Sequence, residues 1–298
     1  MTPPSPTRAT LEGRTYNDLR NLARRSGRDP AEYFTLYALE GFLSRLTASQ
    51  FSQDFVVKGG VLLAAFALRR PTRDIDLSAL GFSNDVAEVV ERVATIATTP
   101  VQDGLTFQAD AISGSQIRDE EIYAGVRVKI PARLATARVP LHVDVNFGDP
   151  IWPGPALTEV PRLLGGTMRL SGYPVHMVLA EKIVTALERG ELNTRWRDFV
   201  DISLISKRQI VSGVDLRKAL EAVARHRAVP IGSLSAPTAD LPDLAQRKWE
   251  VWRRKQRLES LTPRSFGALL STCLTFADPI LQGDASDRIW NPTKEAWE

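Results

Sequence analysis

The stretch that decides the fold is FVVKGGVLLAAFALRRPTRDIDL, residues 55–77. It opens with a short β-branched run, passes through Lys58-Gly59-Gly60, and stays apolar from Val61 to Leu68. This pattern predicts a strand, a glycine turn and a helix whose N-terminus faces the turn. Because glycine has no Cβ, the backbone N–H groups of such a turn can approach a phosphate closely. We therefore expect an anion-binding turn at Gly59-Gly60.

An acidic pair, Asp74 and Asp76, ends the same stretch. Residues two apart on a strand face the same way, so the two carboxylates are expected to lie side by side. Like charges this close repel each other unless they share a cation, which favours a divalent metal with hard oxygen ligands. The alternative is a polar strand face neutralised by Arg69, Arg70 and Arg73. A phosphate-binding turn beside a metal pair indicates nucleotide chemistry.

A third carboxylate lies on a later predicted strand, Leu141 to Phe147, in which polar and apolar residues alternate. The polar face of this strand carries Asp144 between His142 and Asn146. An Asp in the middle of a β-branched strand is costly unless it has a partner. Either a metal shared with the earlier acidic pair or a hydrogen bond to His142 or Asn146 would supply one.

Composition bounds the class of protein. At 298 residues, with 43% hydrophobic and 24% charged residues, the chain is long enough for two modest domains. The net charge of +3 does not by itself indicate nucleic acid. Cys273 is the only cysteine, which excludes an intrachain disulfide or a cysteine-cluster metal site and fits a reducing cytosol. The chain shows no apolar leader and no run of membrane-spanning length, so we expect a cytoplasmic monomer without a membrane partner.

Periodicity predicts strands followed by a helical region. Strands are expected over residues 105–112, 123–130 and 139–147, and helices over residues 15–28, 31–47, 84–97, 175–189, 194–205, 215–227, 241–258 and 265–276. The domain boundary is placed near Gly165-Gly166, which gives a first domain of residues 1–165 and a helical second domain of residues 166–298. Residues from Gly283 onward are expected to be poorly structured, with Trp290 and Trp297 docking on the domain.

Five blocks of sequence occur in a fixed order along the chain: Lys58-Gly59-Gly60, Arg73-Asp74-Ile75-Asp76-Leu77, Tyr173-Pro174-Val175, Ala180-Glu181-Lys182 and Arg197-Asp198-Phe199-Val200-Asp201-Ile202. This series resembles the AbiEii/AbiGii family of toxin nucleotidyltransferases, including the MenT-type toxins. The resemblance covers about residues 55–205. It implies an α+β fold, with a DNA polymerase β-like nucleotidyltransferase core on a mixed sheet and a helical domain after it. It also implies a toxin that is countered by a separately encoded cognate antitoxin.

The resemblance also assigns roles to residues. Asp74 and Asp76 match the metal ligands, and Asp144 occupies the third-carboxylate position of the wider superfamily. Lys182 looks like the family lysine that contacts the nucleotide phosphates, and Asp198 like the acidic residue that follows it. The same resemblance makes the predicted turn and its flank the nucleotide-binding residues: Lys58, Gly59, Gly60 and Arg73.

One position departs from the wider superfamily, which usually has Gly-Ser where this chain has Gly59-Gly60. The serine hydroxyl would contact a phosphate, so backbone N–H groups must suffice here. Two alternatives also stay open for the later blocks. Lys182 could be a surface lysine with a partly buried stem, and Asp198 and Asp201 could pair with neighbouring arginines on their helix.

The predicted function is a toxin enzyme that binds an NTP between the Gly59-Gly60 turn and Lys182. Mg²⁺, as two ions and with Mn²⁺ as a substitute, would be held by the three aspartates, and NMP would pass to the 3′ end of tRNA, blocking aminoacylation and translation. Asp144 would help to deprotonate the attacking hydroxyl. The alternatives are NMP transfer to a protein or small-molecule hydroxyl, and a non-catalytic protein that binds nucleotide or RNA.

A basic helix predicted at 246–258 could contact the RNA. Trp249 and Trp252 are interleaved there with cations, of which the candidate RNA-binding residues are Arg247, Lys248, Arg253, Arg254 and Arg257. Such a helix could follow a phosphate backbone while an indole stacks on a base. The alternative is a solvated helix whose tryptophans pack on the domain. Two further basic groups are Arg20, Arg24, Arg25 and Arg28, and Arg127, Lys129, Arg133 and Arg138.

Overall fold

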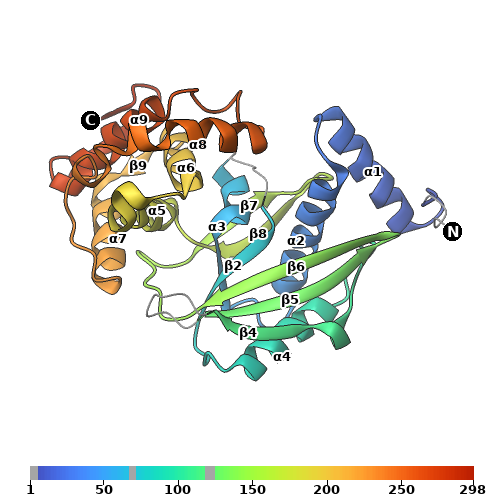
Figure 1. The fold of residues 1–298 in the computed structure, drawn as a ribbon. Coiled ribbons are helices and arrows are strands. Elements are labelled where there is room, and N and C mark those ends of the chain that lie inside the picture. The colour runs from blue at the N-terminus through green and yellow to red at the C-terminus, as the bar shows by residue number, and fades with distance from the viewer. Residues whose placement is uncertain (1–5, 67–71, 118–124) are drawn as a thin grey trace. The chain divides into compact units, whose positions relative to one another are not determined.

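The computed structural model describes residues 6–66, 72–117 and 125–298, and the chain divides into two compact units. The first unit takes residues 1–65, 69–148 and 156–172, and the second takes residues 66–68, 149–155 and 173–298. The first is built on a mixed sheet and the second mainly from helices, which confirms the expected α+β class (Figure 1). The predicted boundary at residues 165/166 falls in the turn of a hairpin of the first unit.

The sheet of the first unit has eight strands in the order β3-β5-β6-β2-β1-β8-β7, and β4 pairs with β5. Its strands are β1 (Phe55–Lys58), β2 (Asp74–Ala79), β3 (Leu105–Phe107), β4 (Ser113–Ile117), β5 (Gly125–Leu134), β6 (Ala137–Asn146), β7 (Ala156–Pro161) and β8 (Thr167–Gly172). The pairs β2·β6 and β1·β8 are parallel and the other pairs are antiparallel. Burial alternates along β5 and β6, so one face of these strands is apolar and covered while the other is polar.

Three long helices among the described residues of the first unit contact the sheet: α1 (Leu11–Arg25), α2 (Pro30–Ala48) and α4 (Val86–Thr98). In Figure 1, α2 and α4 lie on the same side of the β4-β5-β6 region. Helix α4 is capped by Asp85, whose carboxylate accepts a hydrogen bond from the backbone N–H of Glu88 at 2.9 Å. The Ser83 hydroxyl donates to the Glu88 carboxylate at 2.6 Å.

The helix predicted for 61–68 is shorter than expected and begins earlier. It is a single α-helical turn, α3 (Gly59–Leu62), followed by a 3-10 turn, η1 (Leu63–Phe66), and residues 67 and 68 lie outside the described part of the chain. The four side chains from Val61 to Ala64 are all buried. Because no apolar stripe alternates with an exposed face, the sequence pattern could not separate one long helix from two short turns.

Three strands of the first unit were not predicted: β4, β7 and β8. The β7–β8 hairpin turns at Gly165 and Gly166, which adopt φ angles of +96° and +80°. Its first strand exposes Leu157 by 75%, so its apolar alternation is weak. Residues 148–155, just before this strand, are rich in Gly and Pro, which favours a loop. The edge strand β4 has the sequence SGSQI, which shows no strand periodicity and is held in place by its pairing with β5.

The second unit contains α5 (Val175–Arg189), α6 (Trp196–Ser206), α7 (Gly213–His226), α8 (Leu241–Lys255) and α9 (Phe266–Gln282). A small sheet of this unit is formed by β9 (Val211–Ser212), β10 (Ile289–Asn291) and β11 (Ala296–Trp297). Short 3-10 turns are η2 (Ala109–Ala111) in the first unit and η3 (Gly190–Leu192) and η4 (Ala236–Thr238) in the second. The expectation of a poorly structured C-terminus was wrong, because its tryptophans anchor it. Trp290 is buried and donates to the carbonyl of Ser206 at 2.7 Å, and Trp297 donates to the carbonyl of Phe276 at 2.9 Å.

Candidate active site

Four charged side chains form a row across four neighbouring strands of the first unit. In register, Lys58 of β1 lies opposite Asp76 of β2, Asp76 opposite Asp144 of β6, and Asp144 opposite Arg127 of β5. Residues at paired positions point to the same face of a sheet. Two carboxylates are therefore flanked by a cation on either side, and we call these four residues the charged row.

Asp74 lies in the next row of the same face. It is two residues before Asp76 on β2 and pairs in register with His142 of β6. The three aspartates therefore lie on one face of the adjacent strands β2 and β6. Arg73, just before β2, is exposed. Arg69 and Arg70, the alternative partners of the acidic pair, lie outside the described residues.

The partner of Asp144 was not foreseen. Its Oδ1 accepts from Arg127 Nε at 2.7 Å and its Oδ2 accepts from Arg127 Nη2 at 2.6 Å, a bidentate pair. From the sequence, His142 and Asn146 are the expected partners, because neighbours along a strand are visible there. The cross-strand register that brings Arg127 to Asp144 is set by the β5–β6 hairpin and is not visible there.

Arg127 interacts electrostatically with all three aspartates. Its hydrogen bonds to Asp144 raise the pKa of the guanidinium, burial lowers that pKa by less, and the negative charges of Asp144, Asp74 and Asp76 raise it further. The Arg127 side chain is 43% exposed, whereas that of Asp144 is 11% exposed. The guanidinium is therefore a cation at the edge of the acidic face, with one side open to solvent.

The glycine turn packs against the acidic pair. Gly59 has a φ of +70°, and a Cβ built there would lie 1.8 Å from Asp76 Oδ2. Glycine is required at this position for two reasons: the left-handed backbone conformation and the close approach to the Asp76 carboxylate. The turn therefore fixes the position of Asp76, a role separate from the predicted binding of an anion.

The oxygen donors on this face fit a magnesium ion bound together with a substrate. Among the described residues, no three His, Cys, Asp or Glu side chains are arranged so that they could hold a metal ion by themselves. Mg²⁺ commonly uses only one or two carboxylates and takes its remaining ligands from water and substrate phosphates. Asp74 and Asp76, on one face of β2, match that donor set. Both oxygens of Asp144 accept hydrogen bonds from Arg127.

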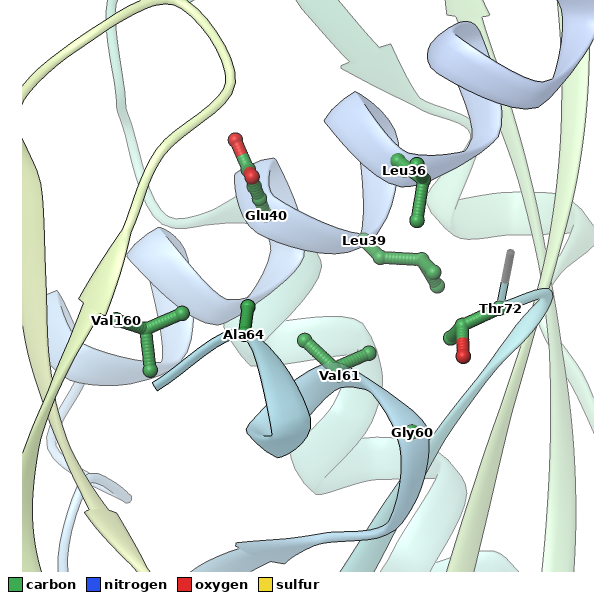
Figure 2. Close-up of a pocket in the computed structure, with 8 residues that line it drawn as sticks. All are labelled: Leu36, Leu39, Glu40, Gly60, Val61, Ala64, Thr72 and Val160. Atoms are coloured by element: carbon green, nitrogen blue, oxygen red, sulfur yellow. The ribbon is translucent and has the colours of Figure 1, made fainter. Parts of the chain in front are cut away.

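A small pocket lies beside the glycine turn, between α2 and the turns that follow β1 (Figure 2). Its cavity volume is about 20 Å³, and its lining residues are Leu36, Leu39, Glu40, Gly60, Val61, Ala64, Thr72 and Val160. The Glu40 carboxylate accepts from the backbone N–H of Leu163 at 3.1 and 3.0 Å. The rest of the lining is mostly apolar, and a cavity of this size holds about one water molecule, so it is too small for a phosphate.

In the second unit, Lys182 is held by two carboxylates. Its Nζ donates to Asp198 Oδ1 at 3.1 Å and to Asp201 Oδ2 at 2.7 Å. The Lys182 side chain is only 11% exposed, which excludes the surface-lysine alternative. Asp198 also contacts Arg195, with an Nε–Oδ2 distance of 3.3 Å.

Asp201 is the residue that sequence reasoning undervalued. It makes the shorter contact to Lys182, and its side chain is 2% exposed, whereas the sequence analysis favoured Asp198. The available signal was the spacing of the two aspartates, which places both on one face of α6. Lys182 on α5 and the aspartate pair on α6 thus form a buried ionic cluster.

Some side chains of the basic helix α8 make contacts that stabilise the fold. Trp249 is fully buried and donates to the carbonyls of Pro263 and Arg264 at 3.3 and 3.1 Å, so it packs on the domain and is not available to stack on a base. Arg253 donates to the carbonyls of Glu259 and Thr262 at 2.7 and 2.8 Å. The remaining candidate RNA-binding residues are exposed: Arg247, Lys248, Arg254 and Arg257.

The mixed sheet, the glycine turn and the charged row together define a candidate nucleotidyltransferase. The sequence profile of the family described as "Nucleotidyl transferase AbiEii toxin, Type IV TA system" matches residues 41–272, which is more than half of the chain. The chain belongs to this family of nucleotidyltransferase toxins, as the sequence resemblance predicted. Membership in a toxin–antitoxin family implies an antitoxin as partner.

Two solved structures are remotely similar. A proposed nucleotidyltransferase from H. pylori has 13% identity and a TM-score of 0.43, covering 82% of this chain and 85% of that chain. JHP933 from Helicobacter pylori has 15% identity and a TM-score of 0.41, covering 75% of this chain and 94% of that chain. A comparison with curated proteins gives no significant match. None of the helices within the described residues is long and apolar enough to cross a membrane.

Proposed function

We propose that this protein transfers NMP from an NTP to the 3′ end of tRNA in a Mg²⁺-dependent reaction, and that this modification blocks aminoacylation. The observation that carries the proposal is the acidic pair of β2, packed against a glycine turn and flanked by Lys58 and Arg127. A triphosphate needs cations around it, and a site of this composition supplies them. The choice of tRNA as acceptor rests on the resemblance to the MenT-type toxins.

Asp74 and Asp76 would hold the metal ion, with Mn²⁺ as a substitute for Mg²⁺. A metal bound there would neutralise charge on the triphosphate and favour ionisation of the attacking hydroxyl. The donor set supports one ion held by this pair. A second ion would require Asp144 to exchange its two hydrogen bonds from Arg127 for metal coordination.

The remaining roles belong to side chains and backbone of the chain itself. Backbone N–H groups of Gly59 and Gly60, with Lys58 and Arg73, would bind phosphate oxygens. Lys182 would contact the nucleotide phosphates, with Asp198 and Asp201 fixing its ammonium group.

In the transfer, the 3′-hydroxyl oxygen of the acceptor bonds to the α-phosphorus of the NTP. The bond between the α-phosphorus and the oxygen that bridges it to the β-phosphorus breaks, and pyrophosphate leaves with that electron pair. The hydroxyl proton needs a carboxylate acceptor on the acidic face. Asp144 could serve only after its bidentate contact with Arg127 loosens, because both of its oxygens already accept hydrogen bonds.

The acceptor is tested by incubating the purified protein with α-labelled NTPs, Mg²⁺ and either total tRNA or total cell protein. We expect label in the tRNA fraction, removable by digestion from the 3′ end, and none in protein. Label in protein alone would replace tRNA by a protein hydroxyl as acceptor. Absence of label with all four NTPs, in protein that binds NTP, would remove the transfer reaction itself.

A further inference from the structure

A row of cations leads away from the acidic face along the β5–β6 hairpin. Alternate residues of β5 on the polar face are Arg127, Lys129, Pro131 and Arg133, and their register partners on β6 are Asp144, His142, Pro140 and Arg138. Successive pairs are about 7 Å apart along the strands, so the face extends roughly 20 Å from the charged row to Arg133. We call the exposed cations Lys129, Arg133 and Arg138 the basic track.

Positive side chains outnumber negative ones on this part of the sheet. Across β4, β5 and β6, the only acidic residue is Asp144, at the end next to the acidic pair. Lys129, Arg133 and Arg138 are exposed, and none of them forms an ion pair within the described residues. The opposite face carries the buried apolar residues that pack under the helices. The open face is thus a positively charged surface that ends at three carboxylates.

The far end of the track places two like charges directly opposite each other. Arg133 and Arg138 are cross-strand partners, an arrangement that destabilises a sheet when no anion lies between the two charges. A surface hollow beside them is lined by both arginines together with Gln108, Pro131, Ala132, Val139 and Pro140. Two prolines and two guanidinium groups offer flat apolar and cationic surface, which suits a phosphate with its attached nucleoside.

We propose that the basic track binds the phosphate backbone of the single-stranded 3′ end of the acceptor RNA. The inference rests on the proposed function, since the terminal hydroxyl must reach the acidic face while the preceding phosphates remain bound. The charge on the track decreases toward the carboxylates, so a strand laid along it would bring only its end to Asp74 and Asp76. The positive charge of the basic track complements the negative phosphates of an RNA strand. The open face of the sheet leaves room for unpaired nucleotides.

The test compares three variants of the full chain, each with three cations changed to glutamine. The track variant carries Lys129→Gln, Arg133→Gln and Arg138→Gln. A charge-matched control carries Lys207→Gln, Arg208→Gln and Arg225→Gln, which change exposed residues of the second unit. A third variant carries Arg247→Gln, Lys248→Gln and Arg254→Gln on α8. Binding of a 5′-fluorescein single-stranded RNA of 15 nucleotides is followed by anisotropy from 0.05 to 0.3 M salt, and circular dichroism checks that each variant is folded.

Each phosphate contact to a single strand contributes about 0.7 to the slope of log K against log salt. Loss of three contacts should reduce that slope by about 2 and weaken binding about 100-fold at 0.1 M salt. The control variant should bind within twofold of the unchanged protein. Equal weakening in the track and control variants, or weakening confined to the α8 variant, would overturn the track.

Transfer assays separate this inference from the proposed function. If the unchanged protein labels RNA and the track variant labels it equally well at subsaturating RNA, the track is refuted while NMP transfer stands. If the unchanged protein labels no RNA, yet the track variant alone loses RNA binding, the track stands and the transfer reaction is refuted.

Discussion

Replacing Gly59 by alanine tests whether the glycine turn positions the acidic pair. The new Cβ would lie 1.8 Å from Asp76 Oδ2, 2.7 Å from Cγ and 2.9 Å from Cβ, where real contacts are no closer than 3.0 Å. Oδ2 must therefore move by at least the 1.2 Å difference between 1.8 and 3.0 Å. Because the overlap includes Cβ of Asp76, rotation of the carboxyl group alone does not relieve it.

Gly81 supplies a matched control. Its φ of +76° is close to the +70° of Gly59, but a Cβ there would meet nothing within 4 Å. A side chain in this left-handed region costs roughly 1–2 kcal/mol, so Gly59→Ala and Gly81→Ala should each lose at least this much free energy of unfolding. Only the Gly59 change moves a carboxylate of the acidic pair.

The assay is single-turnover transfer of labelled NMP, with urea unfolding measured on the same samples. A displacement of about 1 Å at a reacting centre can cost roughly 100-fold in rate, so we expect Gly59→Ala to slow transfer about 100-fold or more and Gly81→Ala to leave it unchanged. Transfer by Gly59→Ala at the rate of Gly81→Ala would refute the claim that the turn fixes Asp76.

Three further predictions concern single contacts. Arg127→Lys keeps the charge but not the bidentate geometry, so transfer should fall by about 10-fold or more with little change in the urea midpoint; equal activity would remove Arg127 from the site. Asp103→Ala removes two contacts to the buried guanidinium of Arg45, at 2.5 and 3.1 Å, and leaves that charge buried without the carboxylate. The free energy of unfolding, measured with urea, should therefore fall by about 3–5 kcal/mol, and a loss under about 1 kcal/mol would contradict this. Burial raises the pKa of the Cys273 thiol to about 12; above pH 9 the unfolded thiol loses its proton while the folded one keeps it, so the folding equilibrium constant should fall up to tenfold per pH unit, a dependence that Cys273→Ala should remove.

Much of the site was predictable because its signals are local. The spacing of Asp74 and Asp76 fixes their common face whatever the rest of the chain does. Asp144 was found because a polar residue interrupts a β-branched run, and the apolar stripe of residues 175–189 gave the bounds of α5. These inferences need only the periodicity of a strand or a helix.

The parts that failed depend on tertiary pairing. Arg127 reaches Asp144 through hairpin register, and Asp201 reaches Lys182 through the packing of α5 on α6. Strand β4 has one large apolar side chain, Ile117, and is defined by its partner strand. The C-terminal strands form because Trp290 finds an internal carbonyl, a contact that spans 84 residues. The partners of these contacts lie 17, 19 and 84 residues apart and on different elements, so the periodicity of a single strand or helix does not reveal them.

The most direct test of the central claim is NMP transfer by Asp76→Ala with increasing Mg²⁺, compared with Asp110→Ala, which changes an exposed aspartate of η2. Isothermal titration of Mg²⁺ in the presence of a non-hydrolysable NTP gives a second readout. We predict that Asp76→Ala loses transfer and metal binding together while remaining folded, and that Asp110→Ala keeps both. Full transfer by folded Asp76→Ala would contradict the assignment of the β2 acidic pair as the catalytic centre.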